Sequence, residues 1–277
     1  MAYEAKILAD HLAPSGKRLT TFEVTFPRIV LAEFNTHRTM SRNSASSRAI
    51  PVEKLLKKVE EDPFIPIYWG KNQKGMQADQ ELSPEDQDNA GFAWLAARGR
   101  AVDWAKTMLE YGVHKQITNR LLEPFLWHTV ICSATEYENF FALRTHPDAQ
   151  PEIRHIAVMM QDLYRSQKPT PVPDGFWHLP LVTDFQDLIQ EGYSLADIQQ
   201  ISVGRCARVS YMTHAGKRDP KADIELAGRL RASGHMSPFE HVAQALSEPE
   251  RSGNFVGWAQ YRKSLDGEAV FAPNMSV

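Results

Sequence analysis

A stretch rich in arginine and hydroxyl side chains lies between residues 36 and 48. It interleaves His37, Arg38, Arg42 and Arg48 with serine, threonine and asparagine residues. The guanidinium group is a planar fork of N–H donors that matches the oxygens of a phosphate, and nearby hydroxyl and amide groups complete an anion-binding nest. Composition alone leaves two interpretations open, a cradle for a phosphate-bearing ligand or a solvated polar loop.

A second candidate is Arg144, which follows the apolar run Phe140–Leu143. A guanidinium at the edge of an apolar patch needs a polar partner, because an unpaired charge is costly there. The partner is either Glu152, in a structural ion pair, or a bound substrate. Ion pairs are the more common case, so the residue types alone favour Glu152.

The segments Cys206–Ser210 and Gly234–His241 form a third candidate. Within the second segment, Ser237 and Glu240 have the spacing of a capping box, in which both side chains satisfy backbone amides at the start of a helix. His235 lies just before this turn. A histidine in such a place either bonds to the backbone or contacts a ligand.

The composition is that of a globular protein with one large domain. The 277 residues are 43% hydrophobic and 23% charged, which is ordinary for a folded chain. The net charge of −3 and the lack of a basic stripe argue against a nucleic-acid partner. No apolar run approaches the roughly 20 residues of a membrane helix, and the first residues lack a signal pattern. We therefore expect a cytoplasmic protein without a membrane partner.

Cysteine usage points the same way. Cys132 and Cys206 are the only cysteines, and neither lies in the C-x-x-C spacing of a metal site. We expect two reduced core thiols and no metal ion.

The elements that must position these candidates begin with a strand. Phe22, Val24 and Phe26 alternate with polar residues, which predicts a half-buried strand that ends at Pro27. An apolar helix or turn follows from residue 29, and residues 35–48 are predicted to be a polar loop.

Helices dominate the rest of the chain. Ser83 and Pro84 are predicted to begin a long helix that ends at Gly112 and keeps Phe92 and Val102 on an apolar face. A long loop is predicted over residues 62–83. The other predicted helices span residues 51–61, 113–123, a stretch from about 148, 194–203, and 220–233, where Gly234 closes the last one. This mix predicts an α/β (α+β) protein.

Taken together, the three candidates resemble the flavin-dependent thymidylate synthases of the ThyX type. Three family motifs carry the resemblance. Residues 36–48 match the first, R-H-R-x-x-S-x-N-x-x-S-x-R. Asn139–Arg144 and Ala149–Ile153 match the second, N-F-L-x-L-R followed by A-Q-x-E-I. Ala207–Tyr211 and Gly234–His241 match the third, A-R-V-S-[FY] followed by G-H-x-[ST]-P-F-E-H. Their joint presence favours the ligand-binding interpretations over the structural ones.

The chain departs from the family in two ways. The G-H-x-[ST]-P-F-E-H segment usually precedes the arginine signature but follows it here, so the chain order looks circularly permuted, which surface chain ends tolerate. Thr36 replaces the first arginine of the signature, whose charge-assisted bond would contribute about 1.5–3 kcal/mol. Residues 255–263 echo the stretch that leads into the family signature, so we hypothesise that Arg262 or Lys263 supplies the missing charge.

The resemblance implies a ThyX-like fold, with a small central, mostly antiparallel sheet flanked by long helices. We expect a single catalytic domain over residues 1–277. It would comprise a half that carries the arginine signature (1–168), a Pro-rich surface connection (about 167–190) and a permuted segment (about 191–277).

The resemblance also implies a reaction, the reductive methylation of dUMP to dTMP. Methylene-tetrahydrofolate would donate the carbon, FAD would carry the hydride and NADPH would supply it, without an enzyme nucleophile. Arg144 matches the family arginine that stabilises the ionised uracil ring. The physical basis is that a fixed cation in a dry site favours an anionic, electron-rich ring.

By the same matching, the other site residues fall into two sets. The residues expected at the nucleotide are Glu33, Ser44, Ser46, Ser47, Arg48 and Arg120, together with Arg144. The residues expected at FAD are Thr36, His37, Arg38, Asn139, His235 and Ser237, and His235 would also lie near the folate. Ser44 stands where the family usually has an acidic residue. The family assembles these sites between the subunits of a homotetramer, so we expect self-association.

Other functions remain open on the sequence. The departures at Thr36 and Ser44 leave room for hydroxymethylation of the base or for action on dCMP. Cytosine lacks the imide proton, so Arg144 would have less to stabilise there. A non-catalytic protein that binds a nucleotide or a flavin is the alternative of a different class, although such a scaffold needs neither Arg144 nor Arg120.

Overall fold

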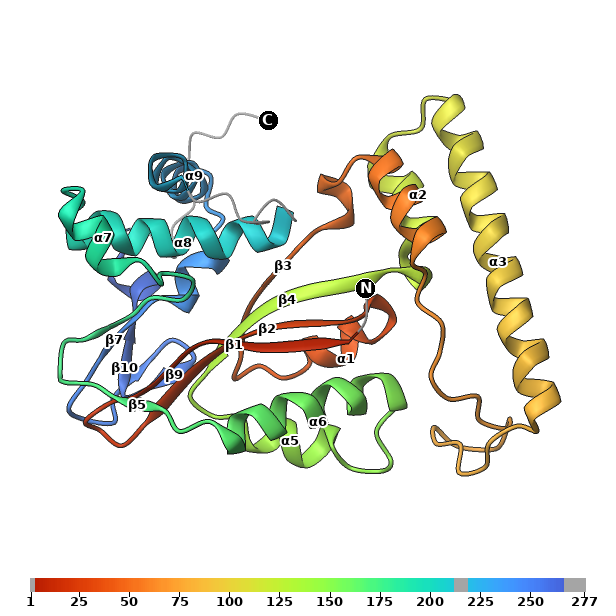
Figure 1. The fold of residues 1–277 in the computed structure, drawn as a ribbon, viewed down its shortest axis with the longest axis horizontal. Helices are drawn as coiled ribbons and strands as arrows, with labels where there is room; N and C mark the ends of the chain where they lie inside the picture. Colours follow the sequence, from red (N-terminus) through yellow and green to blue (C-terminus); the bar gives the residue numbers. More distant parts are fainter. Residues whose placement is uncertain (1–2, 212–218, 267–277) are drawn as a thin grey trace.

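A five-stranded sheet forms the centre of the molecule (Figure 1). The structure, a computed structural model, describes residues 3–211 and 219–266, with the backbone alone for residues 210 and 211. The sheet order is β3-β4-β2-β1-β5, and all pairs are antiparallel except β1 with β5. Its strands are β1 (Glu4–Leu12), β2 (Arg18–Pro27), β3 (Ser41–Ser44), β4 (Trp127–Ala134) and β5 (Thr170–Pro171). This architecture confirms the predicted α/β class with a small, mostly antiparallel central sheet.

β2 lies in the middle of this sheet and ends where the sequence predicts. Its apolar side chains Phe22, Val24 and Phe26 are fully buried. The prediction that the strand is only half-buried is wrong, because Thr21 and Thr25 on its other face are buried as well. Both threonines can leave water because each hydroxyl bonds to a hydroxyl of β4.

Helices cover both faces of the sheet. α5 (Glu138–Arg144) and α6 (Pro151–Ser166) pack on the face of Phe22, and the predicted apolar face of α6 is confirmed, since Ile153 and Ile156 are fully buried. α8 (Leu195–Tyr211) covers the opposite face, where Cys206 packs on β4. The sheet therefore lies between two helical layers (Figure 1).

The remaining elements surround this core. The other helices are η1 (Arg28–Val30), α1 (Leu31–Asn35), η2 (Ser47–Ala49), α2 (Val52–Glu61), α3 (Pro84–Glu110), α4 (Lys115–Thr118), η3 (Asn119–Phe125), α7 (Phe185–Gln190), α9 (Pro220–Ala232), η4 (Ser237–His241) and η5 (Tyr261–Ser264). The other strands are β6 (Trp177–His178), β7 (Ala243–Ala245), β8 (Arg251–Ser252), β9 (Phe255–Val256) and β10 (Trp258–Gln260). β10, β7 and β6 form a second sheet, and β8 pairs with β9.

The long helix α3 begins and ends as predicted. The Ser83 hydroxyl accepts a hydrogen bond from the Asp86 amide, and Gly112, just beyond the helix, has a φ of +74°. One part of the prediction is wrong: Phe92 is 77% exposed, whereas Val102 is buried between α3, α2 and η3. In Figure 1, α3 lies beyond α2, at the opposite end of the molecule from α7.

Three other predictions need correction. The polar loop over residues 35–48 contains the strand β3, because its backbone pairs with the edge of β4. The helix predicted over 113–123 is the short α4 followed by a 3₁₀ segment. The helix predicted over 194–203 continues to residue 211 as α8. The strands β1 and β4 and the helix α5 were not predicted.

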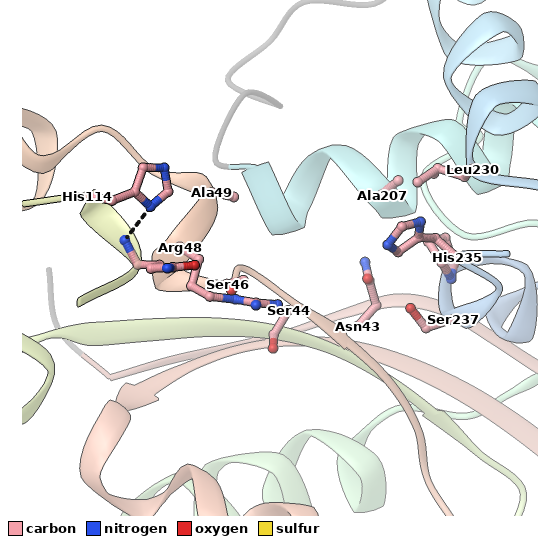
Figure 2. Close-up of a pocket in the computed structure, with 12 residues that line it drawn as sticks. Asn43, Ser44, Ser46, Arg48, Ala49, His114, Ala207, Leu230, His235 and Ser237 are labelled. Carbon is pink, nitrogen blue, oxygen red and sulfur yellow. Dashed lines mark hydrogen bonds between the residues drawn. The ribbon is translucent and has the colours of Figure 1, made fainter. Parts of the chain in front are cut away.

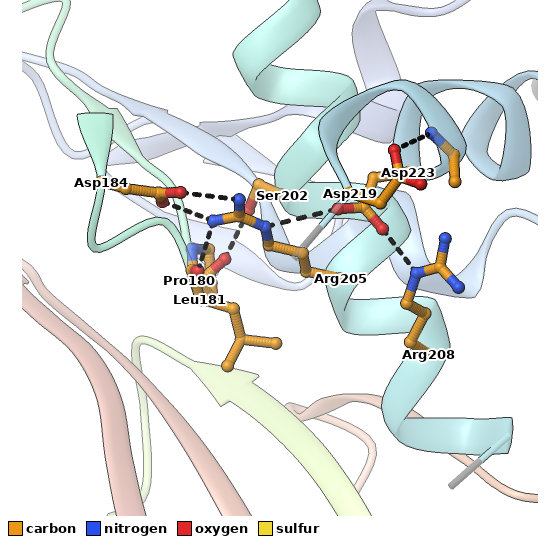
Figure 3. Close-up of polar contacts among 9 residues, drawn as sticks. Pro180, Leu181, Asp184, Ser202, Arg205, Arg208, Asp219 and Asp223 are labelled. Atoms are coloured by element: carbon orange, nitrogen blue, oxygen red, sulfur yellow. Dashed lines mark hydrogen bonds and ion pairs between the residues drawn. The ribbon is translucent and has the colours of Figure 1, made fainter. Parts of the chain in front are cut away.

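α8 and α9 pack together through buried charges and a glycine. Arg205 donates to both carboxylate oxygens of Asp184, at 2.6 and 2.9 Å, and Asp223 of α9 accepts from both Arg205 and Arg208 (Figure 3). Gly204 lets the backbones approach, since a Cβ atom at this position would lie 2.4 Å from the carbonyl oxygen of Asp223. These contacts fix the part of α8 that covers the sheet.

This packing predicts opposite effects for two glycine substitutions in neighbouring helices. Gly204→Ala should lower the free energy of unfolding by about 1–3 kcal/mol, because the methyl group meets a backbone atom that cannot move aside. Gly228→Ala in α9 should raise it by about 0.5–1 kcal/mol, because no atom lies within 4 Å of the added Cβ atom and alanine favours a helix. Urea denaturation of both variants checks this. An equal effect at the two positions would contradict the packing.

Candidate active site

A cavity of about 400 Å³ opens between the arginine-rich stretch and the later part of the chain (Figure 2). Residues from η2, β3 and α4 form one side, and residues from α8, α9 and η4 form the other. Its lining consists of Asn43, Ser44, Ser46, Arg48, Ala49, His114, Gln116, Ala207, Leu230, His235, Ser237 and Pro238. The structure thus brings together segments that are about 190 residues apart in the sequence.

The first side of this pocket is held by buried hydrogen bonds. The Asn43 side chain donates to the carbonyl oxygen of Cys206 at 2.7 Å, which joins β3 to α8. The Ser47 hydroxyl donates to Glu123 at 2.6 Å, and Asn119 donates to the Ser47 carbonyl oxygen at 2.7 Å. The backbone is thereby fixed at Asn43 and at Ser47, and the exposed Arg48 side chain extends toward Ser44 (Figure 2).

The second side of the pocket begins where α9 ends. Gly234 has a φ of +73°, and the His235 amide turns back to donate to the carbonyl oxygen of Leu230 at 2.9 Å. The predicted capping box is wrong. Residues Ser237–His241 form the 3₁₀ helix η4 without a side-chain cap, because the Glu240 carboxylate binds Arg262 instead.

Arg144 lies beside the arginine-rich stretch. Its Nε atom donates to Nε2 of His37 at 2.8 Å, and its Nη2 atom donates to the Thr36 hydroxyl at 3.2 Å and to the Glu33 carbonyl oxygen at 3.4 Å. These contacts replace the structural ion pair with Glu152, whose buried carboxylate accepts from a neighbouring glutamine instead. The structure therefore places the Arg144 guanidinium beside the arginine-rich stretch and not beside Glu152.

His37 is a buried imidazole that is kept neutral. Its ring packs edge-on against Phe140, with 5.0 Å between the ring centres. Burial, the Arg144 guanidinium and the Arg42 guanidinium lower the pKa of His37 to about 4, against a bond to Asn139 that raises it. At neutral pH, Nε2 therefore offers a lone pair to Arg144.

Arg38 and Arg42 lie close to one another in the same stretch. Arg42 is half-buried, and it donates to the carbonyl oxygens of Asn35 and His37 at 3.1 and 2.7 Å. Burial lowers the pKa of Arg42, and the charge of Arg38 lowers it further. The two guanidinium groups therefore repel each other. Because Arg38 is exposed, an anion from solution could bind there and would stabilise the pair.

The predicted site residues therefore fall into three places. Ser44, Ser46, Arg48, His235 and Ser237 line the pocket. A second group surrounds the Arg144 guanidinium, which contacts His37, Thr36 and the Glu33 carbonyl oxygen. Asn139 bonds to His37, and Arg38 follows His37 in the sequence. Ser47 and Arg120 both donate to Glu123, and neither Arg120 nor Arg144 lines the pocket.

Several lining residues were not predicted. Gln116 belongs to α4, and His114 caps the start of this helix, where its ring accepts from the Gln116 amide. Asn43 was part of the signature without an assigned role, although its side chain is buried. No pattern in the sequence connects α4 with the signature, because the contact arises only when η2 packs on α4 and η3.

Both cysteines are free and buried, as predicted. Burial raises the pKa of Cys132 to about 12 and raises the pKa of Cys206 as well. Neither thiol forms the thiolate that a nucleophile needs near neutral pH. Within the described ranges, no helix is long and apolar enough to cross a membrane.

A comparison with protein families decides the relationship. The family described as thymidylate synthase complementing protein matches residues 7–170, which is more than half of the chain. The chain belongs to this family. The matched part contains the arginine-rich stretch and Arg144, and the resemblance predicted from the motifs is confirmed.

Two solved structures show a weaker likeness to this chain. A UMP/dUMP methylase PolB from Streptomyces cacaoi bound with 5-Br UMP has 14% identity and a TM-score of 0.49, over 60% of this chain and 89% of that one. The same methylase bound with 5-Br dUMP has 20% identity and a TM-score of 0.46, over 54% of this chain and 67% of that one. The search of curated proteins found no match.

The match to the thymidylate synthase complementing family ends before the second side of the pocket begins. His235, Ser237 and Pro238 lie beyond residue 170, yet they face Ser44 and Arg48 across the cavity. The later part of the chain therefore completes a pocket that the matched part begins.

The Arg144–His37 contact predicts a change that can be measured without a ligand. Arg144→Ala should raise the pKa of His37 above its value of about 4, because the second largest cause of the lowering is removed, while burial keeps the pKa below 6.5. NMR titration of the histidine rings checks this. Arg120→Ala serves as the control and should leave His37 unchanged, because Arg120 binds Glu123. An unchanged pKa of His37 in Arg144→Ala would contradict the contact.

Proposed function

We propose that this protein is an FAD-dependent thymidylate synthase that methylates dUMP to dTMP. Methylene-tetrahydrofolate would be the carbon donor, and NADPH would be the source of the hydride. The observation that carries the proposal is the Arg144 guanidinium, which the His37 ring and the Thr36 hydroxyl hold at the signature of the family. A purely structural arginine at this position would pair with a carboxylate.

In this proposal, Arg144 acts on the uracil ring. His37 is neutral at neutral pH, so it orients the guanidinium without cancelling its charge. That charge stabilises the uracil ring once the imide proton has left, which makes the ring carbon nucleophilic enough to take up a methylene group. The dry surroundings of His37 and Phe140 strengthen the effect.

The nucleotide is proposed to bind through the arginine-rich stretch. Arg48 is exposed to the pocket, and its planar fork suits the phosphate group. Ser44 and Ser46 line the same pocket and supply hydroxyl donors. Ser47 and Arg120 are proposed to hold the sugar or phosphate from the side of η3. Glu33 is proposed as a further contact, because one of its carboxylate oxygens is buried and has no partner among the described residues.

The residues expected at FAD fit a ligand with two phosphates. Arg38 is exposed next to Arg42 and repels it, so a diphosphate would relieve this repulsion. Thr36, His37 and Asn139 would hold the cofactor on the side of Arg144, and His235 and Ser237 on the side of the pocket. When bound, FAD would supply the hydride that completes the methyl group.

Self-association and a permuted chain order complete the proposal. Arg144 does not line the pocket of its own chain. A site that needs both would form where Arg144 of one copy meets the pocket of another, and we propose a homotetramer. The segment after residue 190 is proposed to be the part that precedes the signature in other members. Its position across the pocket from the signature supports this.

Two departures from the family favour a second candidate, action on dCMP or hydroxymethylation instead of methylation. Ser44 removes an acidic contact in the pocket, and Thr36 removes a cation. A non-catalytic binding protein is disfavoured, because it has no use for a guanidinium held beside a neutral imidazole.

Incubation with dUMP or dCMP, methylene-tetrahydrofolate and NADPH, followed by mass analysis of the nucleotide, tests the function and the role of Arg144 together. The wild type should convert dUMP to dTMP. Arg144→Ala should lose at least about a thousandfold in turnover, as when a preorganised electrostatic group is removed, while it retains its flavin absorbance. Turnover of Arg144→Ala at the wild-type rate would overturn the assignment, and a hydroxymethyl product or conversion of dCMP alone would establish the second candidate.

The Arg262 hypothesis gives a separate prediction. Arg262 binds Glu240 beside a small cavity that also contacts Lys263 and Gln260, and Gln260 donates to Ser41 of the signature. Arg262→Ala should weaken flavin or nucleotide binding by about tenfold, as expected when a charge-assisted bond is lost. Fluorescence and calorimetric titrations measure this, with the exposed Arg229→Ala as the control. The hypothesis fails if neither affinity changes.

A further inference from the structure

A chain of buried hydrogen bonds runs from the central sheet to the pocket wall. The Ser133 hydroxyl of β4 bonds to Nδ1 of His241 at 2.9 Å and to the Thr21 hydroxyl of β2 at 2.6 Å. Thr21 bonds to Nε2 of His178 at 2.7 Å, and Nδ1 of His178 bonds to His11 at 2.9 Å. The four groups from His178 to His241 are all fully buried.

The chain joins the two parts of the protein that build the pocket. Thr21 and Ser133 belong to the part that matches the family, whereas His178 and His241 lie beyond residue 170. Buried hydroxyl and imidazole groups are costly unless every one of them has a partner. The two parts therefore fit together in one arrangement, because a shift between them would leave buried polar groups without partners.

Each group in this chain depends on its neighbours for hydrogen bonds. A hydroxyl has one proton to donate, and a neutral imidazole donates through one ring nitrogen and accepts through the other. Burial lowers the pKa of His241 to about 3 and lowers the pKa of His178, so both rings are neutral. Removal of the Ser133 hydroxyl would leave both Thr21 and His241 one partner short.

His241 is also the last residue of η4, the segment that carries the pocket wall. Ser237 and Pro238 of the same short helix line the pocket, and His235 lies just before it. The Nε2 atom of His241 has no partner among the described residues, so the bond to Ser133 through Nδ1 alone orients the ring. On the outer side, η4 is held by the bond between Glu240 and Arg262.

We propose that His241 is a positioning residue that fixes the Ser237 wall of the pocket through its bond to Ser133. The ring docks η4 onto β4, and thereby sets where Ser237 and His235 stand relative to Ser44 and Arg48. Only the identity of the ligand, a pyrimidine nucleotide, rests on the proposed function. The docking itself is a property of the protein without ligand.

The test compares variants of this bond with a matched pair in the same sheet. Ser133→Ala and His241→Leu remove the bond, and His241→Asn keeps an amide near the place of Nδ1. Thr129→Val is the control, because Thr129 and Thr25 form the same kind of hydroxyl pair between β4 and β2, at 2.9 Å, away from η4. Hydrogen–deuterium exchange of residues 234–241 and dUMP affinity by calorimetry are measured for each variant.

Ser133→Ala and His241→Leu should speed the exchange of residues 234–241 by at least about tenfold relative to β1 and β2, and should weaken dUMP binding by about tenfold. His241→Asn should keep both the exchange rate of residues 234–241 and the affinity for dUMP close to the wild-type values. Thr129→Val should change neither quantity. If His241→Leu does not fold, Ser133→Ala and His241→Asn provide the same comparison. Unchanged exchange in residues 234–241, or an equal rise across the whole chain, would overturn the proposal. Faster exchange in a protein whose wild type does not bind dUMP would support the docking and refute the nucleotide function.

Discussion

The hydrogen bond from Arg144 to a neutral His37 is the constraint on which the rest of the site depends. A cation beside a buried imidazole is stable only if the imidazole stays unprotonated and offers its lone pair. The surroundings meet this condition through burial of the ring and through the charges of Arg144 and Arg42, which lower the pKa of His37. The guanidinium is thus held by neutral oxygen and nitrogen acceptors, which orient it without cancelling its charge. A carboxylate partner would have weakened the field that it presents to a ligand.

The fold meets a second requirement, which is to fix a polar stretch without burying the side chains of Arg38 and Arg48. The short strand β3 is paired with β4, and the Asn43 amide ties it to the backbone of α8. Ser41, at the start of β3, accepts from Asn254 and Gln260 of the later part of the chain. The exposed side chains Arg38 and Arg48 therefore project from a backbone that is held from both sides. Preorganisation of this kind lowers the cost of ordering a site when a ligand binds.

Sequence patterns predicted local features better than the features that depend on contacts across the molecule. The cap at Ser83, the end of α9 at Gly234 and the buried face of α6 follow from residue types within a few positions. The strand β3 was missed because its polar residues are paired by β4, which is remote in sequence. The capping box at Ser237 failed because Arg262 offers Glu240 a stronger, charged partner than a backbone amide. The family motifs identified the residues around Arg144, whereas His114 and Gln116 reach the pocket through packing that no motif records.

The most direct measurement of the central claim is the acidity of the uracil imide in the bound nucleotide. Titration of dUMP labelled with ¹⁵N at N3, bound to the protein, reports by NMR whether the ring loses its proton more readily than in free dUMP. We predict a lowered pKa of the imide in the wild-type complex and a value close to that of free dUMP in the complex with Arg144→Ala. An imide that titrates in the wild-type complex as it does in free solution would contradict the account, and so would a lowered pKa that persists without the guanidinium.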